Sequence, residues 1–440
     1  MNYQLLIEKA KIENFTDIEI YKAKSSSMTL SIFNGEVDKT EIKDSLNYTV
    51  RGIYNNKMAY FSFEDEDIDL DLVINTLKAN ATSLNTKEEF EIYAGDATYP
   101  EKRTLKGTFL NVSVSEKIDL LKKIEKAVKS KDARIVSVPY CRYNEVVSKV
   151  EIVNSKGLNL EKENELCNII VQAIAKDNNA SYSQFDLDIS LDYNDLVNSD
   201  IVERVTNKLL SKFNAEPVAS KTYPVVFENE AMADLFEVFS SFFSGEAAIK
   251  KLTPLVGKEG EKIFSEKITI IDDPTMKDAI EYEPFDDEGV ACYRKEVVKD
   301  GVFQGLLHNL KTAKYFNTKS TGNGFKSGAN VTVRGVNLYI AKGDATKEEL
   351  FAGIKEGLYI TEVTGLHAGA NPITGDFSTQ SSGYLIEDGK ITRPVTLIVV
   401  SGNFFKMMNE IEAIGDDLKI FSSGIGSPSI RFRSLPVSGK

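Results

Sequence analysis

The chain is poor in the side chains that most often hold metal ions. Its 440 residues include two histidines, three cysteines and no tryptophan. These residues are His308 and His367, with Cys141, Cys167 and Cys292. The sequence contains no HExxH motif and no CxxC pair, and no cysteine follows Cys292, so a cysteine-rich zinc site is excluded. Two histidines that meet carboxylates in space stay open as an alternative.

Long apolar runs are also missing. No segment approaches the roughly 18–20 apolar residues that cross a bilayer. The start, MNYQLLIEKAKIENF, lacks the basic and apolar regions of a signal peptide. We therefore expect a cytoplasmic protein with free thiols and no membrane partner. The formal net charge of −13 would repel a polyanion and no dense basic patch offsets it, so we expect no nucleic-acid partner.

Turn dipeptides between alternating apolar and polar residues are frequent. They occur at Asn34-Gly35, Asn55-Asn56, Asp300-Gly301 and Asp388-Gly389. Asn and Gly accept the positive φ that a two-residue type I′ turn requires. The pattern predicts an α+β fold with mostly antiparallel sheets and packed helices, and it disfavours a parallel βαβ sheet.

Helices are expected where apolar residues recur at helical spacing. The pattern predicts helices over 116–130, 229–243, 347–358 and 404–414. Capping boxes precede two of them, at Ser113 with Glu116 and at Thr346 with Glu349.

The length of 440 residues is too great for one ordinary core. Residues 211–224 interrupt the periodic pattern with two prolines and small residues, so we place a boundary near residue 215. This predicts an N-terminal α+β domain over 1–215 and a C-terminal β-rich domain over 220–440. Residues 1–85 and 114–213 share the order helix, strands, helix, which suggests an internal duplication.

Two polar clusters have ordinary structural explanations. Ser378, Ser381 and Ser382 lie near His367 in sequence, but without a G-x-S-x-G elbow they are better explained as turn residues than as nucleophiles. The glycine-rich segment STGNGFKSGAN, 320–330, is followed by a strand pattern. A phosphate-binding loop would open a helix, so we expect a flexible loop that comes close to another backbone.

An acidic segment, EYEPFDDEG, covers residues 281–289. Its carboxylates are Glu281, Glu283, Asp286, Asp287 and Glu288. Such a group can bind a hard cation such as calcium. A solvated charged loop is the favoured interpretation.

The order of motifs in the second half carries more information than any one of them. The segments are PFDDEGVACYRKEVVKDGVFQGLLHNLKTAKYF, STGNG, GLHAGANPITGDFSTQSSGYLIEDGKITRPV and VSGNFFKMMNEIEAIGDDL. In this order they resemble the TldD/PmbA family, most closely its PmbA branch, also called TldE. The resemblance is specific over residues 220–440 and weaker over the first half.

The resemblance implies a cytoplasmic metalloprotease system that processes unfolded peptides. In that family a TldD subunit holds zinc through an HExxxH helix and a later cysteine. A PmbA-type subunit pairs with it, lacks the metal site and helps to enclose a chamber. The expected partners of this chain are therefore a TldD-type zinc subunit or a second copy of itself, together with a peptide.

This chain departs from the zinc-binding pattern at each ligand. The helix that corresponds to HExxxH reads NEAMAD, in which Asn229, Glu230 and Asp234 take the motif positions. The C-terminal segment reads FSSGIGSPS and has no cysteine. Without zinc, Glu230 has no activated water to serve as a base for. We therefore expect no catalytic residue and no metal in this chain, with zinc in the partner.

The stretch 364–382 is interpreted as a surface that faces peptide or partner. Its glycines permit close backbone approach. The residues expected to bind are His367, Gly369, Asn371, Thr374, Asp376 and Ser378. His367 is either a substrate contact or a structural turn residue.

Two alternatives stay open. The chain could be an autonomous homodimeric hydrolase with a site near His367, or a scaffold or regulator without a role in proteolysis. An older family label that links it to DNA gyrase gains no support from the net charge of −13. We also expect an obligate dimer with the second domain at the interface, because sheet edges and apolar patches usually find partners.

Overall fold

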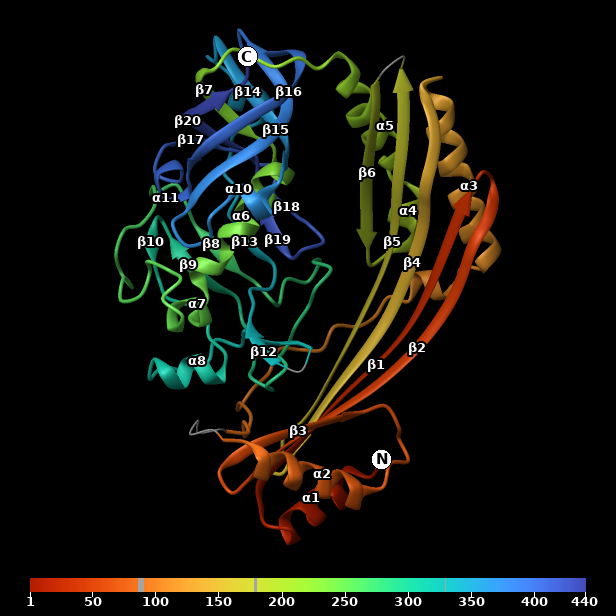
Figure 1. Ribbon diagram of the computed structural model, residues 1–440, viewed down its shortest axis with the longest axis vertical. Helices are drawn as coiled ribbons and strands as arrows, with labels where there is room; N and C mark the ends of the chain where they lie inside the picture. Colours follow the sequence, from red (N-terminus) through yellow and green to blue (C-terminus); the bar gives the residue numbers. More distant parts are fainter. Residues whose placement is uncertain (86–90, 178–179, 329) are drawn as a thin grey trace.

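The computed structural model describes residues 1–85, 91–177, 180–328 and 330–440. A long curved sheet from the first half of the chain stands beside a rounder second half, and the two meet near the lower end of the view (Figure 1). Among the described residues, no helix has the length and apolar composition that crossing a membrane requires.

The first half folds on one six-stranded sheet with the antiparallel order β3-β2-β1-β4-β5-β6. Its strands are β1 (Phe15–Phe33), β2 (Glu36–Tyr54), β3 (Lys57–Phe63), β4 (Ile135–Asn154), β5 (Asn159–Asp177) and β6 (Ala180–Ser190). Its helices are α1 (Tyr3–Ile12), α2 (Leu70–Ser83), α3 (Val114–Lys131), α4 (Tyr193–Val197) and α5 (Ile201–Ser211), with 3₁₀ turns Thr108–Asn111 and Lys212–Asn214.

Two separate cores hold this sheet. At one end α1 and α2 pack on β1 to β3 around Leu6, Ile20 and Leu77. Farther along, α3 to α5 cover β1, β4 and β5 around Leu121 and Val205. The first unit has the order helix, three strands, helix, and the second has one helix, three strands and the two helices α4 and α5. The proposed duplication stays a prediction.

The second half contains two six-stranded sheets and a hairpin. The first has the order β16-β15-β14-β7-β20-β17, and β16 also pairs with β20. Its strands are β7 (Lys221–Phe227), β14 (Glu356–Thr364), β15 (Asp376–Glu387), β16 (Lys390–Asn403), β17 (Ile411–Ile414) and β20 (Ile430–Ser438). The second has the order β10-β9-β8-β13-β19-β18. Its strands are β8 (Ile270–Asp272), β9 (Lys295–Lys299), β10 (Val302–Phe303), β13 (Leu338–Ile340), β18 (Lys419–Ile420) and β19 (Ile425–Ser427). The hairpin is β11 (Gly324–Ser327) with β12 (Asn330–Val333).

Short helices connect these strands. They are α6 (Asn229–Ser240), followed by the 3₁₀ turn Ser241–Phe243, then α7 (Gly245–Ile249), α8 (Leu310–Tyr315), α9 (Lys347–Phe351), α10 (Leu366–Gly369) and α11 (Phe404–Met407). Within the described strands, the pairs β14–β7 and β13–β19 are parallel and the others antiparallel. The predicted α+β class with mostly antiparallel sheets is confirmed.

The turn dipeptides form hairpins as predicted. Both residues of each pair have positive φ: 52° and 80° at Asn34-Gly35, 50° and 60° at Asn55-Asn56, 48° and 78° at Asp300-Gly301, and 48° and 76° at Asp388-Gly389. They join β1 to β2, β2 to β3, β9 to β10 and β15 to β16. The capping box of Ser113 and Glu116 opens α3, and that of Thr346 and Glu349 opens α9.

Two predicted helices are shorter than their periodicity suggested. The helix expected over 347–358 ends at Phe351, because Gly353 has a φ of 74° and the chain enters β14 inside the sheet. The helix expected over 404–414 ends at Met407, and Ile411–Ile414 forms β17 beside β20. Their apolar residues are buried in either conformation, so burial spacing alone did not distinguish helix from strand.

The glycine-rich segment is also more regular than expected. Gly324–Ser327 forms strand β11 rather than a flexible loop. The expected close approach does occur: a Cβ on Gly322 would lie 2.6 Å from the carbonyl oxygen of Ala291. The predicted boundary near residue 215 falls between the 3₁₀ turn Lys212–Asn214 and β7.

The acidic segment is not a solvated loop. Glu283, Asp286, Asp287 and Glu288 are buried. Lys162 of β5 forms ion pairs with Glu283 and Asp287, and Tyr21 of β1 donates its hydroxyl to Asp287 at 3.0 Å. The backbone N–H groups of Glu288, Val290 and Gly324 donate to Asp286. The prediction was wrong because Lys162 and Tyr21, which are distant in sequence, pair with Glu283 and Asp287 and join the two halves.

Candidate functional site

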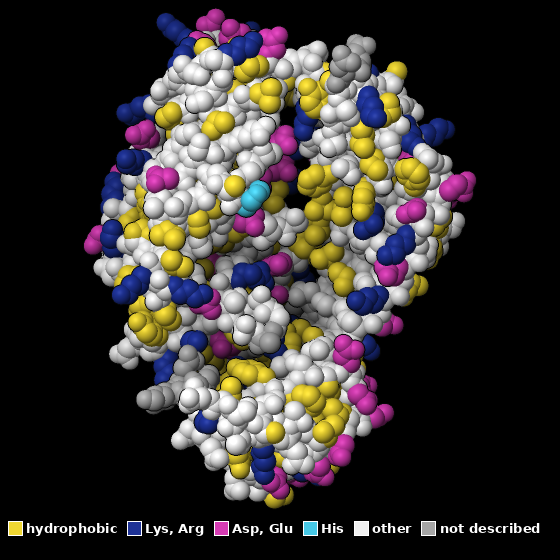
Figure 2. Space-filling model, viewed as in Figure 1, with side chains coloured by type: hydrophobic (Ala, Val, Ile, Leu, Met, Phe, Trp, Pro, Cys, Tyr) yellow, Lys and Arg dark blue, Asp and Glu magenta, His cyan; other side chains and the backbone are white. Residues whose placement is uncertain are grey.

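A cleft of about 1070 Å³ lies between the two halves. One wall consists of β6 and α5, and the other of α6, the end of β14, parts of β15 and β16, and residues 418–424. The space-filling view shows an opening between the halves, with acidic side chains on the wall of the second half (Figure 2). The cleft combines this volume with many charged side chains from both halves, so we take it as the candidate site.

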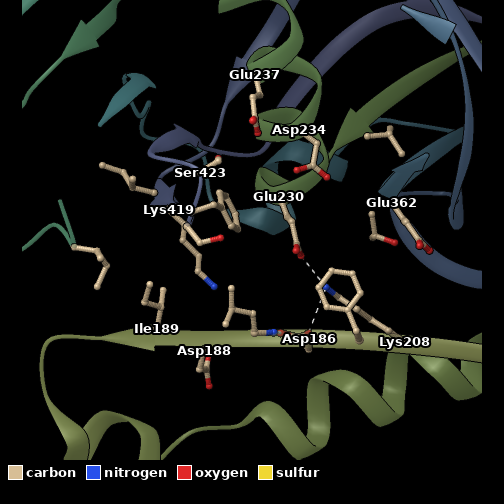
Figure 3. A pocket seen from close by; sticks show the side chains of 18 of the residues that line it. Asp186, Asp188, Ile189, Lys208, Glu230, Asp234, Glu237, Glu362, Lys419 and Ser423 are labelled. Atoms are coloured by element: carbon tan, nitrogen blue, oxygen red, sulfur yellow. Dashed lines mark hydrogen bonds and ion pairs between the residues drawn. The ribbon is translucent and has the colours of Figure 1, made fainter. Parts of the chain in front are cut away.

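Helix α6 carries three of the acidic side chains of the cleft. Its apolar stripe, which includes Phe236 and Phe239, is fully buried against the core of the second half. Glu230, Asp234 and Glu237 recur at the spacing of one helix face and line the cleft (Figure 3). The predicted helix over 229–243 is confirmed, and the same periodicity that buries one face directs the acids into the cleft.

One of these acids is paired across the cleft. Lys208 of α5 donates to Glu230 at 2.7 Å, and its ammonium lies 3.7 Å from Asp186 of β6 (Figure 3). Burial of Lys208 acts to lower its pKa, but the charges of Glu230 and Asp186 outweigh burial and leave the pKa raised. A second pair, Lys212 with Glu362 of β14, spans the cleft at 3.4 Å.

Asp234 differs from Glu230 because it has no ion-pair partner among the described residues. Burial, with the neighbouring charges of Glu230 and Glu237, raises the pKa of Asp234 to about 6. The cleft therefore contains one carboxylate in an ion pair with a lysine, Glu230, and one whose pKa is raised to about 6, Asp234.

The donor set of the cleft does not fit a zinc ion. Asn229 donates its amide to the carbonyl of Asp417 at 3.0 Å, and the ammonium of Lys208 occupies Glu230. The residues of FSSGIGSPS that reach the cleft, Phe421 to Gly424, present no thiolate or imidazole. In the described parts of the chain, no three His, Cys, Asp or Glu side chains are placed to hold a metal.

The loop expected to bind peptide or partner lies largely outside the cleft. Of the stretch 364–382, only Thr364 and Ser382 line it. His367, Asn371, Thr374, Asp376 and Ser378 are exposed, and Gly369 is half-buried. The role of these six residues stays a prediction, and their exposure suits a partner-facing surface better than a peptide-binding one.

Much of that loop's polarity is used within the turn. Asn371 accepts from the N–H groups of Ile373 and Thr374, and Asp376 accepts from Thr374 and Asn403. Hydrogen bonds from Asn403 and Thr374 lower the pKa of Asp376. A Cβ on Gly369 would lie 2.4 Å from the carbonyl oxygen of Ser378, so this glycine allows the close approach that was expected.

The other histidine has a structural environment, as expected. His308 is buried, and its Nδ1 lies 3.1 Å from the hydroxyl of Thr312 in α8. Burial lowers the pKa of His308. Neither His308 nor His367 lines the cleft.

Strand β6 forms a free edge of the first sheet along the cleft (Figure 1). The N–H of Leu187 bonds to the side chain of Asp186, and the carbonyls of Phe185 and Ser183 accept from the side chains of Gln184 and Lys212. Odd-numbered residues of β6 therefore direct their backbone groups away from β5. Natural edges usually carry lysine, proline or a bulge. The cleft-lining part of β6 has none of these, and Phe185 is 63% exposed.

Sequence reasoning missed this wall of the site. Asp186, Lys208 and Lys212 belong to the first half, and no motif or unusual spacing marks them. Only the packing of α5 and β6 against the second half brings them to α6. Two buried side-chain oxygens on this wall, Gln184 Oε1 and Asp186 Oδ2, also lack a hydrogen bond among the described residues.

Comparison with known proteins covers nearly the whole chain. Residues 18–81, 107–213 and 220–439 match, in turn, domain 1, the central domain and the C-terminal domain of the PmbA/TldA metallopeptidases. A metalloprotease PmbA homolog from Buchnera aphidicola subsp. Acyrthosiphon pisum is 25% identical over 438 residues, which cover 96% of this chain and 93% of the relative.

Solved structures agree in fold. A protein from Thermotoga maritima described as a modulator of a DNA gyrase is 32% identical, with a TM-score of 0.90 over 99% of each chain. TldE from Thermococcus kodakarensis has a TM-score of 0.88 at 24% identity over 99% of each chain. The similarity extends through both walls of the cleft.

Proposed function

The chain belongs to the PmbA/TldD metallopeptidase family, and on that basis we propose that it is a peptide-binding subunit without a zinc site of its own. It works with a zinc-bearing, TldD-type subunit of the same family, which supplies the metal that activates water for peptide hydrolysis. The compartment is the cytoplasm, where the three buried cysteines, free in this structure, stay reduced.

The observation that carries this proposal is the unprotected edge of β6 inside the cleft. An extended peptide adds to such an edge through main-chain hydrogen bonds, which do not depend on its sequence. The outward N–H groups of odd-numbered residues supply these bonds, and that of Leu187 exchanges its present bond to the side chain of Asp186 for one to the peptide. The exposed ring of Phe185 supplies apolar contact.

The absence of a zinc site is supported by the chemistry of α6. An amide at Asn229 is a poor zinc ligand, and Glu230 is neutralised by Lys208 rather than by a metal. Because the ammonium of Lys208 already occupies the carboxylate of Glu230, this side chain is not free to contact a water in this chain. Catalysis is therefore assigned to the partner.

Peptide binding is tested by replacing the backbone donor at the edge. Phe185→Pro removes an outward N–H without touching the ladder to β5, since proline is tolerated on the open side of an edge strand. Phe185→Ala is the matched control, because it keeps the N–H and loses the ring. With a fluorescein-labelled unfolded peptide, anisotropy should show about tenfold weaker binding for Phe185→Pro. Equal affinity of parent and Phe185→Pro would refute strand addition at β6.

The subunit role has a separate test. Metal analysis of the purified chain should find no stoichiometric zinc, and the chain alone should not cleave the peptide. Cleavage should appear when a TldD-type subunit with an intact HExxxH is added. One tightly held zinc per chain, lost on Glu230→Gln or Asp234→Asn, or cleavage by this chain alone, would overturn the assignment.

A further inference from the structure

The two sides of β6 differ in chemistry where this strand borders the cleft. Its even-numbered side chains lie on the side of α5, where Arg204 contacts Asp186 at 3.1 Å and Asp188 at 2.6 Å. Its odd-numbered side chains lie on the other side, because side chains alternate along a strand. Figure 3 shows Asp188 and Ile189 on opposite sides of β6. One side of this edge is therefore charged, and the odd-numbered residues set the character of the other.

The odd-numbered side of β6 is apolar. Its cleft-lining residues are Phe185, which is exposed, and Leu187 and Ile189, which are half-buried. On the neighbouring strand β5, Ile170 lies directly opposite Leu187 and continues the apolar side. In the described parts of the chain, none of these four side chains packs into a hydrophobic core. The space-filling view shows hydrophobic side chains gathered on the first half beside the opening (Figure 2).

We propose that the cleft selects peptides in which apolar and polar side chains alternate. This inference rests on the proposed addition of a peptide to the edge of β6. A peptide residue opposite Phe185, Leu187 or Ile189 projects to the same side of the sheet, with Cβ atoms about 5 Å apart. The residues before and after it in the peptide project to the charged side. An apolar side chain is therefore favoured at every second position of the peptide, and a polar one between them.

The charged side disfavours a uniformly apolar peptide. Asp186 and Asp188 contact Arg204, and Lys208 lies 3.7 Å from Asp186. An apolar side chain placed here would remove water from these charges without returning a hydrogen bond. A polar side chain can donate or accept in place of that water. Strands of antiparallel sheets commonly carry this alternation, and unfolding exposes them. The ligand class is therefore an amphipathic strand of an unfolded chain.

Two labelled peptides of one composition test the pattern. In the first, valine alternates with lysine and glutamate. In the second, the same residues are ordered so that valines fall on both sides of an extended strand. At concentrations where sedimentation shows each peptide to be monomeric, anisotropy should show about tenfold tighter binding of the alternating peptide, because all its valines meet the apolar side. Equal affinity for the two peptides would overturn this inference and leave the proposed peptide-binding role intact. If neither peptide binds, both proposals are refuted.

A matched pair of substitutions locates the preference on β6. Ile189→Thr makes the odd-numbered side partly polar and keeps a β-branched residue, so the affinity ratio of the two peptides should fall from about ten to about three or less. Ile391→Thr makes the same change on β16, at a side chain that is 41% exposed and does not line the cleft, and should keep the ratio.

A second variant makes the test independent of the half-buried position. Phe185→Ser, at an exposed ring, should lower the ratio in the same way as Ile189→Thr. Circular dichroism confirms that each variant is folded. A ratio that stays at about ten in both β6 variants, or that falls equally in Ile391→Thr, would overturn the inference.

Discussion

Within the part of the chain that the structure describes, two sets of ionic contacts join the halves of this molecule, and they differ in burial. The first lies where the acidic segment meets β1 and β5: Lys162 is 6% exposed and contacts Glu283 and Asp287. The second crosses the cleft: Lys208 is 31% exposed and pairs with Glu230, which is 44% exposed. Both join a lysine of the first half to carboxylates of the second.

The difference indicates which end of the cleft is fixed. In the buried set, each charge has lost its water and depends on its partner. Although burial acts against both charges, the carboxylate of Asp287 holds the pKa of Lys162 above its usual value, and the ammonium of Lys162 holds the pKa of Asp287 below its usual value. In the cleft set, water can replace the partner at small cost. The buried contacts therefore fix the halves together, while the cleft contacts can yield to a ligand.

The largest expected effect comes from breaking the buried set. Lys162→Met leaves Glu283 and Asp287 buried without their cation, and should lower the free energy of unfolding by about 3–5 kcal/mol. Lys102→Met removes an exposed partner of Glu161 and is the control, with an expected change under about 0.5 kcal/mol. Urea denaturation measures both. A loss below about 1 kcal/mol for Lys162→Met would remove the distinction between the two sets.

A smaller change within the buried set should have an intermediate effect. Tyr21→Phe removes only the hydroxyl that donates to Asp287. Because a buried hydrogen bond to a charged group is lost, we expect a destabilisation of about 1.5–2 kcal/mol in the same denaturation experiment. Tyr315→Phe, at a ring that is 66% exposed, should change stability little. Equal effects of the two substitutions would show that the hydroxyl of Tyr21 does not hold Asp287.

A carboxylate of the cleft, Asp234, should make the stability of the protein depend on pH. In the folded state the pKa of Asp234 is raised from its usual 3.8 to about 6, so the folded protein binds this proton more tightly than the unfolded chain does. Its contribution to stability is fully present below pH 3.8 and is lost as pH rises through about 6. Asp234→Asn should therefore be about 1 kcal/mol more stable than the parent at pH 7, a value reduced for the solvent exposure of Asp234, and equal to it near pH 3.5.

The control for this prediction is Asp416→Asn, at an exposed position. Its stability relative to the parent, measured at each pH between 3.5 and 7, is the reference for an aspartate-to-asparagine change outside the cleft. Thermal unfolding across this range gives the comparison. A constant difference between Asp234→Asn and the parent at every pH would contradict the raised pKa.

The smallest expected effect is on the stability of the cleft pair itself. Lys208→Met should change the free energy of unfolding by less than about 1 kcal/mol. This is smaller than the loss of about 3–5 kcal/mol expected for Lys162→Met. It should also raise the pKa of Asp234 further, because the nearby positive charge that lowers it is removed. Carbon-13 titration of labelled aspartate follows this shift. A loss as large as that of Lys162→Met would mean that both sets fix the halves.

The sequence by itself determined the local features of this protein. Hairpins at Asn34-Gly35 and Asp388-Gly389, the capped start of α3 and the apolar stripe of α6 follow from residues within a few positions of one another. The motif order in the second half was enough to indicate the family. Such features are predictable because φ preferences, capping bonds and helical periodicity act over short stretches of chain.

The tertiary structure alone decided where charge is tolerated and where the cleft lies. The sequence of residues 281–289 is typical of a solvated acidic loop. The fold places Lys162 and Tyr21, which lie more than a hundred positions earlier, beside this segment. The partner of Glu230 on α5 and the free edge of β6 have no local signature. The ends of α9 and α11 were set by strand pairing rather than by their own periodicity. Burial and pairing depend on which distant segments meet, and only the fold determines that.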